Sequence, residues 1–238
     1  MDLTIIIPTL NEAEFLASTI SHLRKCSSSK YEQEIIVVDS GSEDATCEIA
    51  KGLGLSLVEI ESKSIGKSYG LNEAAKLAKG KVLMFLDADT LVPSNYDELI
   101  FSVLENKEII GGAFEFCLDG PEFGLRVVEL INRTRYRIRQ RYYGDQGVFL
   151  RARVFERVGG YPNIGLLESA HLCRKLRKEG KLKLIKKNMK TSPRRFIQGG
   201  IYKVLAGDIK IWFLDLLGIS VSKYAPDYWR ENKFRSKS

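Results

Sequence analysis

Two aspartates, Asp87 and Asp89, directly follow the apolar run 82–86 and are separated by one residue. In an extended chain, residues i and i+2 point to the same side, so the two carboxylates would stand close together. Neighbouring carboxylates repel each other unless a cation neutralises them, and Mg²⁺ or Mn²⁺ accepts one or two carboxylates together with water and phosphate oxygens. The pattern also fits a strand-end turn without a metal. The pair therefore predicts a divalent-cation site or a turn.

Polar side chains also follow two other short apolar runs. Thr9 and Glu12 come after the run at 3–7, and Asp39 ends the run at 34–39. In open parallel sheets, ligands bind at the carboxyl ends of the strands, so we expect these residues on the same rim as the aspartate pair. Asp39 has two interpretations, a contact to a base or ribose, or a cap of the turn that follows it.

The elements that must position these residues alternate along the first half of the chain. Runs typical of strands fall at 3–7, 34–39, 56–60 and 81–86. Between them, apolar residues recur at helical spacing, as in Leu16, Ile20, Leu23 and in Leu71, Ala74, Ala75, Ala78. Strands separated by helices predict right-handed βαβ units and an α/β fold with a mainly parallel sheet, covered by helices on both faces.

After residue 90 the pattern changes. We expect strands at 109–117 and 147–151, and an edge strand at 182–185. Helices are expected at 122–142 and 168–178. No repeat and no Pro- or Gly-rich linker interrupts the chain, so the whole of it is predicted to be one domain.

The net charge of +7 conceals two halves of opposite sign. Residues 1–125 hold 10 basic and 21 acidic residues, whereas residues 126–238 hold 27 basic and 9 acidic residues. A basic half suits an anionic partner such as a phosphorylated substrate, a lipid surface or a nucleic acid, and it also occurs as a solvated face without a partner.

The cysteine spacing and the absence of several motifs argue against a number of protein classes. The four cysteines form no CxxC pair, which argues against a zinc site or a disulfide framework and favours a reducing, cytoplasmic compartment. Neither GxGxxG nor GxxxxGK[ST] occurs, as a dinucleotide oxidoreductase or a P-loop NTPase would require. The arginines of 133–141 alternate around a helix and coat opposite faces, so we expect no nucleic-acid partner. No apolar run reaches the ~20 residues of a membrane-spanning helix.

Taken together, three segments resemble family 2 glycosyltransferases. They are IIIPTLNE at 5–12, IVVDSGSED at 36–44 and LMFLDADT at 83–90. The later segments YGDQGVF, GGYP and TSPRRF are similar to those of a compact bacterial subgroup with short soluble chains. The resemblance covers about residues 3–200.

This resemblance implies a GT-A fold, with a Rossmann-like sheet and a mixed second half, and inverting, metal-dependent transfer of a sugar from a nucleotide-diphosphate donor. Residues 1–120 would bind the nucleotide and 121–200 would hold the acceptor and catalytic groups. Residues 201–238 lie beyond the resemblance and would form a C-terminal amphipathic helix and tail. By matching position, the donor-binding residues are Thr9, Glu12, Asp39, Lys67, Asp87, Arg194 and Arg195. Asp87 and Asp89 would serve the ribose, the metal (Mn²⁺ or Mg²⁺) and the diphosphate.

The chain departs from the subgroup at the expected catalytic base. Where relatives carry Glu-Asp, this chain has Glu168 and Ser169, so the usual Asp is missing. Three alternatives remain: Glu168 takes the acceptor proton, His171 on the next turn takes it, or the protein binds donor with weak or no transfer. Asp145 and Gln146 are candidates for contact with the donor sugar or the acceptor, or for a turn.

The C-terminal segment 201–216 carries apolar residues at helical spacing, flanked by lysines. It predicts either an interfacial helix near a lipid-linked acceptor, with peripheral contact at the inner face of the membrane, or a helix that covers the core or a homodimer contact.

Overall fold

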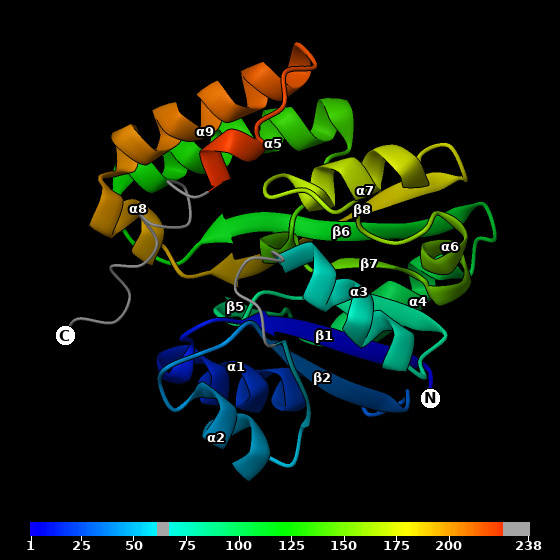
Figure 1. Ribbon diagram of the computed structural model, residues 1–238. Helices are drawn as coiled ribbons and strands as arrows, with labels where there is room; N and C mark the ends of the chain where they lie inside the picture. The colour runs from blue at the N-terminus through cyan, green and yellow to red at the C-terminus, as the bar shows by residue number, and fades with distance from the viewer. Residues whose placement is uncertain (61–66, 226–238) are drawn as a thin grey trace.

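The computed structural model describes residues 1–60 and 67–225, which form an eight-stranded sheet with helices on both faces (Figure 1). The strand order is β3-β2-β1-β4-β7-β6-β8-β5. The predicted α/β architecture, with a mostly parallel first half and a mixed second half, is confirmed.

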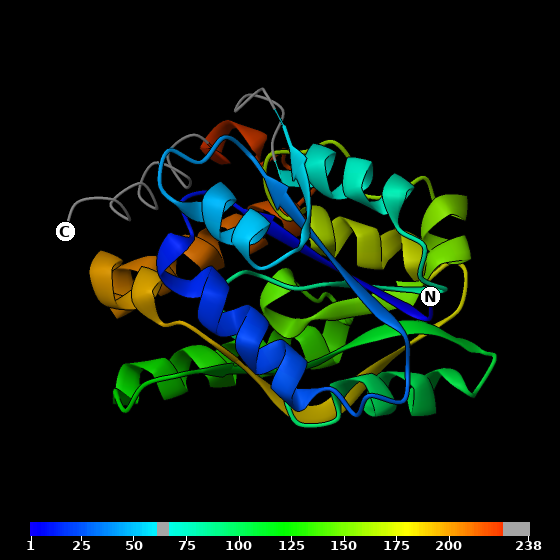
Figure 2. The same ribbon diagram turned by 90° about the horizontal axis from the view of Figure 1, so that it is seen from below.

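The first half is a run of parallel strands. Its elements are β1 (Leu3–Thr9), α1 (Ala13–Cys26), β2 (Gln33–Asp39), α2 (Thr46–Gly52), β3 (Ser56–Glu59), α3 (Lys67–Leu77) and β4 (Val82–Phe85). All four strands were predicted within two residues of their ends, whereas α2 was not predicted. Figure 2 shows α1 and α3 on opposite sides of β1 and β2.

The second half mixes strand directions. Its elements are β5 (Thr90–Leu91), α4 (Tyr96–Leu104), β6 (Ile109–Leu118), α5 (Phe123–Arg139), a 3₁₀ turn (Gly144–Gln146), β7 (Val148–Arg151), α6 (Ala152–Arg157), α7 (Glu168–Leu176), β8 (Lys181–Thr191), α8 (Arg194–Gly199), α9 (Ile201–Leu216) and a 3₁₀ turn (Ser222–Tyr224). Strand β7 runs antiparallel to β4 and β6, and β8 runs parallel to β6.

Two predictions for this half were wrong in extent. The edge strand expected at 182–185 is the eleven-residue β8, which lies inside the sheet between β6 and the short edge strand β5. The helix expected at 122–142 ends at Arg139, because Gln140 adopts a left-handed conformation with φ 47° and its N–H bonds back to Tyr136.

Among the described residues, the two large apolar clusters of the core lie one on each face of the sheet. Alternate residues of β1 divide between them, with Ile6 on one face and Ile5 and Ile7 on the other. Helices α3, α5, α7 and α9 cover the Ile6 face, and α1, α2 and α4 cover the opposite face. Among the described residues, no helix is long and apolar enough to cross a membrane.

Candidate active site

The carboxyl ends of β1, β2 and β4 meet at one rim of the sheet. Thr9 pairs in register with Asp39 of the neighbouring strand, and its hydroxyl donates to Asp39 Oδ2 over 3.1 Å. Asp87 lies two residues after the end of β4, which is parallel to β1. The structure thus brings together the side chains that the sequence placed at three separate strand ends.

Asp39 is buried and its carboxylate is fully used within the rim. Oδ1 accepts the N–H groups of Gly41 and Ser42, at 2.8 and 2.7 Å. Oδ2 accepts the hydroxyls of Thr9 and Ser42, at 3.1 and 2.5 Å. Asp39 therefore builds the turn that ends β2, and any contact to a ligand would be made in addition to these four hydrogen bonds.

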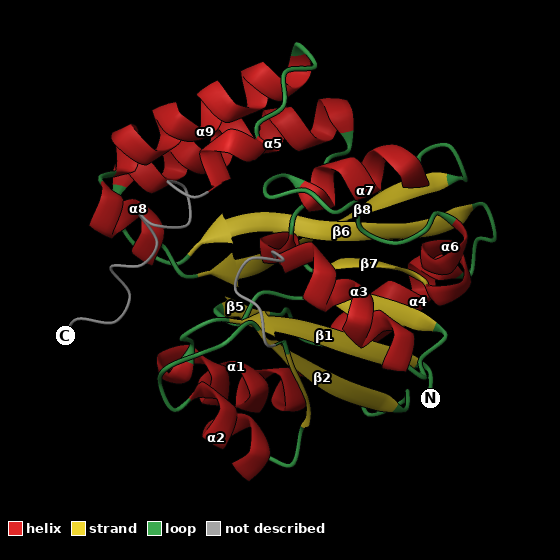
Figure 3. Ribbon diagram, in the orientation of Figure 1, coloured by secondary structure: helices red, strands yellow, loops and turns green. Residues whose placement is uncertain are grey.

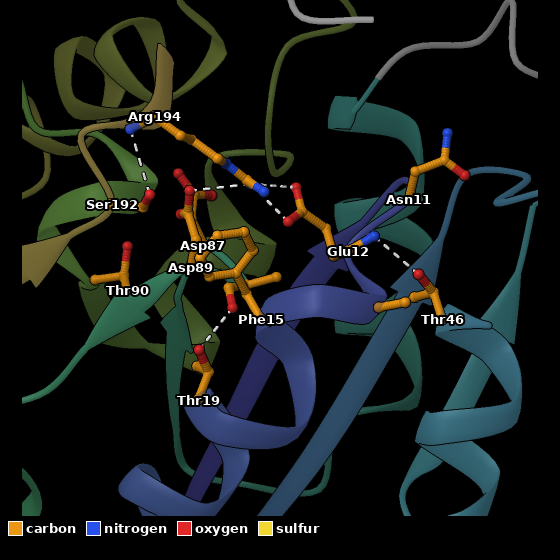
Figure 4. Close-up of polar contacts among 12 residues, drawn as sticks. Asn11, Glu12, Phe15, Thr19, Thr46, Asp87, Asp89, Thr90, Ser192 and Arg194 are labelled. Carbon is orange, nitrogen blue, oxygen red and sulfur yellow. Dashed lines mark hydrogen bonds and ion pairs between the residues drawn. The ribbon is translucent and has the colours of Figure 1, made fainter. Parts of the chain in front are cut away.

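Arg194 lies between the carboxylates of Glu12 and Asp89, both from the first half of the chain (Figure 4). Its Nη2 donates to both oxygens of Glu12, at 2.7 and 2.5 Å, and lies 3.0 Å from Asp89 Oδ2. The guanidinium also stacks on the ring of Phe15, 4.3 Å from its centroid. Burial lowers the pKa of Arg194, but the carboxylates of Asp89 and Glu12 outweigh it and raise the pKa overall.

Asp87, the other aspartate of the pair, forms an ion pair with Lys67. Lys67 Nζ, at the start of α3, donates to Asp87 Oδ1 over 2.6 Å. Burial opposes the charge on Lys67, but the carboxylates of Asp87 and Glu168 hold the pKa of the ammonium above its usual value. Gly144 packs against the same carboxylate, because a Cβ there would lie 2.4 Å from Asp87 Oδ1. Each carboxylate of the pair is thus neutralised by a side chain of the protein itself.

The two candidate bases on α7 lie in different surroundings. Glu168 is the first residue of α7 and is buried, and burial raises the pKa of its carboxyl although Lys67 opposes the shift. His171 Nε2 lies 2.7 Å from Asp215 Oδ1 of α9, and Arg141 donates to the other Asp215 oxygen over 2.7 Å. His171 is therefore tied to α9, while Glu168 shares its electrostatic surroundings with Lys67 and Asp87.

The 3₁₀ turn before β7 carries two predicted site residues, Asp145 and Gln146, which lie in different surroundings. Burial raises the pKa of Asp145 to about 7, and the nearby charge of Asp87 adds to the shift. Within the described part of the chain, Asp145 Oδ1 is buried without a hydrogen-bond partner. Gln146 is buried in the core, where its amide donates to the carbonyl of Phe114 over 3.0 Å, so it supports the sheet.

Arg195 takes a different direction from its neighbour Arg194. Its guanidinium pairs with both oxygens of Asp208 on α9, at 2.6 and 3.0 Å. Sequence reasoning missed both acidic partners on α9, Asp208 and Asp215, and it missed Gly144. Helical spacing put Asp208 and Asp215 on a predicted helix, but it carried no signal for the arginines that they would meet.

Comparisons with known proteins agree with this architecture. The family model described as glycosyl transferase family 2 matches residues 4–157, more than half of the chain, so the chain belongs to this family of glycosyltransferases. Glycosyltransferase AglE of Haloferax volcanii is 27% identical over 171 residues, which are 67% of this chain and 56% of that protein. Poly(ribitol-phosphate) beta-N-acetylglucosaminyltransferase TarS of Staphylococcus aureus is 31% identical over 96 residues, 39% of this chain and 17% of that one. The chain thus spans about half, or less, of the length of these relatives.

Solved structures show the same GT-A type of fold. The mannosyltransferase PcManGT of Pyrobaculum calidifontis, in complex with GDP-Man and Mn²⁺, has a TM-score of 0.63 and 22% identity, over 79% of this chain and 56% of that one. TarS of S. aureus in complex with UDP-GlcNAc has a TM-score of 0.60 and 18% identity, over 81% and 58% of the two chains.

Proposed function

We propose that this protein transfers a sugar, with inversion, from a nucleotide-diphosphate sugar to an acceptor hydroxyl. One observation carries the proposal: the carboxylates of Asp87 and Asp89 lie between the cations Lys67 and Arg194, in the same electrostatic neighbourhood as the buried Glu168. Membership of glycosyl transferase family 2 supports it, as do the relatives solved with GDP-Man and with UDP-GlcNAc.

The donor would lie along the rim formed by β1, β2 and β4. Thr9, Glu12 and Asp39 stand at the ends of β1 and β2, where the nucleoside would bind. Lys67 and Arg194 would meet the diphosphate, because each presents a cation at the aspartate pair. On donor binding, Arg194 would exchange part of its pairing with Glu12 for the phosphate oxygens.

A divalent cation fits the donor chemistry of this place. Mn²⁺ and Mg²⁺ prefer hard oxygen ligands, and Asp89 with Asp87 would supply carboxylate oxygens. The described residues contain no cluster of three or more candidate metal ligands, so a cation here would take its other ligands from the diphosphate and water. When bound, the metal would neutralise charge that develops on the departing diphosphate.

Glu168 would act as the base that takes the proton of the acceptor hydroxyl. A buried carboxyl with a raised pKa holds a proton more tightly than an exposed one, and Lys67 keeps the anionic form accessible. His171 is the less direct candidate, since its Nε2 is engaged by Asp215. Asp145 lies beside Asp87 and would contact the donor sugar or the acceptor.

The second candidate function is donor binding with weak or no transfer. The observation that favours it is Ser169, which stands where the subgroup has its catalytic Asp and is buried.

Calorimetric titration tests the donor site. The protein is titrated with UDP, GDP and dTDP and their sugar conjugates, each with Mn²⁺, with Mg²⁺ and with EDTA. We expect metal-dependent binding of one nucleotide, lost in Asp89→Asn and kept in Asp119→Asn, which changes an exposed carboxylate. Absence of binding for every nucleotide and metal would overturn the proposal.

A further inference from the structure

The outer face of α9 is apolar although it points to solvent. Tyr202, Ile209, Phe213 and Leu216 are separated by seven, four and three residues, so they form one stripe along the helix. All four side chains are exposed, Phe213 by 58%. Leu217, at the end of the helix, extends the apolar surface.

The basic residues of α9 lie on its exposed side and its acidic residues on its buried side. Lys203 and Lys210 are exposed and fall on the stripe next to the apolar one. The acidic residues of the helix, Asp208 and Asp215, are buried and paired with arginines of the protein. The side turned to solvent therefore presents apolar groups and positive charge, without an acidic residue of the helix among them.

Helix α5, next to α9, also carries exposed apolar residues. It packs beside α9 at the same end of the molecule (Figure 3), and a Cβ on Gly124 would lie 3.0 Å from Ile201, so the two helices approach closely. Leu130 and Ile138 of α5 are exposed by 65% and 73%. Isolated exposed apolar residues are ordinary, but several large ones on two adjacent helices mark an interaction surface.

We propose that the α9 face, made of Tyr202, Lys203, Ile209, Lys210, Phe213, Leu216 and Leu217, docks on an anionic phospholipid surface. Helices that lie in the membrane interface combine a stripe of aromatic and aliphatic residues with flanking lysines, and lysines near the surface are attracted by anionic headgroups. The core of a protein–protein interface is depleted in lysine, which favours lipid over a second copy of the chain.

The length of α9 agrees with a helix that lies on the bilayer. Sixteen residues extend over about 24 Å, less than the ~30 Å of the hydrocarbon core, and four of them are charged. Such a helix would bury its apolar stripe at the level of the headgroups and leave the charged residues in water or in ion pairs.

The docking surface is linked to the candidate active site. Arg195 ties α8 to Asp208 of α9, while the adjacent Arg194 reaches Asp89. Docking would therefore hold the rim of the site close to the membrane surface. Binding to lipid does not depend on the proposed transfer, because none of the residues of the α9 face contributes to the donor site.

Vesicle flotation without any nucleotide tests the proposal. Vesicles of phosphatidylcholine alone are compared with vesicles that also contain phosphatidylglycerol, at low and at high salt. We expect the protein to float with the anionic vesicles at low salt, and both Phe213→Ser and Lys203→Glu/Lys210→Glu to weaken partitioning about tenfold or more. The matched control is Leu77→Ser on α3, an equally exposed apolar residue at 59%, which should partition like the wild type.

Three outcomes would overturn it. The protein could remain unbound to anionic vesicles, or Leu77→Ser could weaken binding as much as Phe213→Ser, which would mean that binding is unspecific. Sedimentation velocity could instead reveal a dimer that Phe213→Ser dissociates, in which case a second copy covers this face. Thermal melts of each variant check that the fold is kept. Because donor binding is measured separately by calorimetry, failure of lipid docking and failure of the proposed transfer are distinguishable.

Discussion

At the scale of single residues, the aspartate pair illustrates how one pattern supports two interpretations. A pair of neighbouring carboxylates needs a cation, and the protein supplies Lys67 and Arg194 itself. Lys67 pairs with Asp87, and Arg194 pairs with Asp89. If a diphosphate and a divalent cation bound here, the two basic side chains would pair with phosphate oxygens and the two carboxylates with the cation. In the proposed mechanism the proton acceptor would be Glu168, whose carboxyl interacts electrostatically with Lys67 and Asp87.

Replacing Glu168 by Gln should lower transfer by about two to four orders of magnitude, the range for loss of a general base, while donor affinity stays near that of the wild type. Glutamine keeps the size and removes the proton acceptor. The measurements are turnover of the sugar nucleotide and calorimetric binding of the nucleotide. Glu156→Gln, an exposed position on α6, is the control, and an unchanged turnover in Glu168→Gln would move the role to another group.

Gly144→Ala should weaken nucleotide binding about tenfold, because the added Cβ would lie 2.4 Å from Asp87 Oδ1 and force that carboxylate to move. Calorimetric titration measures the effect. The control is Gly52→Ala in α2, where a Cβ meets nothing within 4 Å. Equal affinities in the two variants would show that the position of Asp87 does not limit donor binding.

We expect Asp145 to make the stability of the protein depend on pH. Because burial raises its pKa to about 7, the unfolded chain ionises first, so stability is present below about pH 4 and is lost as the pH rises towards 7. Asp145→Asn should therefore gain melting temperature relative to the wild type at pH 7.5, by several degrees more than at pH 4.5. Thermal melts at both pH values measure this difference, and a constant offset would contradict the assignment.

At the scale of elements, α9 is held to the rest of the fold by buried ion pairs. Asp215 joins α9 to Arg141 after α5 and to His171 and Arg174 of α7. Burial raises the pKa of Asp215, but His171 and Arg141 outweigh it and lower the pKa overall. The same helix face that carries these pairs lies opposite to the apolar stripe, so ion pairing on the inside leaves the outside free for a partner.

Removing Asp215 should be costly, since it would leave Arg141 buried without its partner. Asp215→Ala is expected to lose about 3–5 kcal/mol of the free energy of unfolding, which chemical denaturation measures. Glu108→Gln breaks an exposed pair with Lys181 and should change stability by less than about 1 kcal/mol. Similar losses in both variants would mean that α9 is not anchored through Asp215.

Some strands could be predicted from the sequence pattern, whereas the full length of β8 could not. Strands β1 and β4 were predicted because their apolar runs are continuous and buried on both faces. Strand β8 was predicted too short because its pairing with β6 is irregular between Phe114 and Glu115, where Ile185 and Asn188 are the partners. Lys186 and Lys187 lie between these two partners. They interrupt the alternation of apolar and polar residues by which a strand is recognised in a sequence.

At the scale of the whole molecule, the opposite charges of the two halves meet at the candidate site. Glu12 and Asp89 come from the acidic half, and Arg194 comes from the basic half, 182 residues after Glu12. The strand ends and their polar residues were predictable, because each follows a local apolar run. The ion pairs between them were not, because contacts over such separations depend on the packing of β8 and α8, which no local pattern contains.

The anomeric configuration of the first product tests the central claim most directly. The sugar nucleotide that calorimetry selects is incubated with the protein and its metal, and the anomeric proton is followed by NMR, with water as acceptor where no other is known. From a donor with an α-linked sugar, inverting transfer predicts that the β-configured product forms first, at a rate that Glu168→Gln reduces. An α-configured first product would contradict inversion, and a donor that stays intact would contradict transfer altogether.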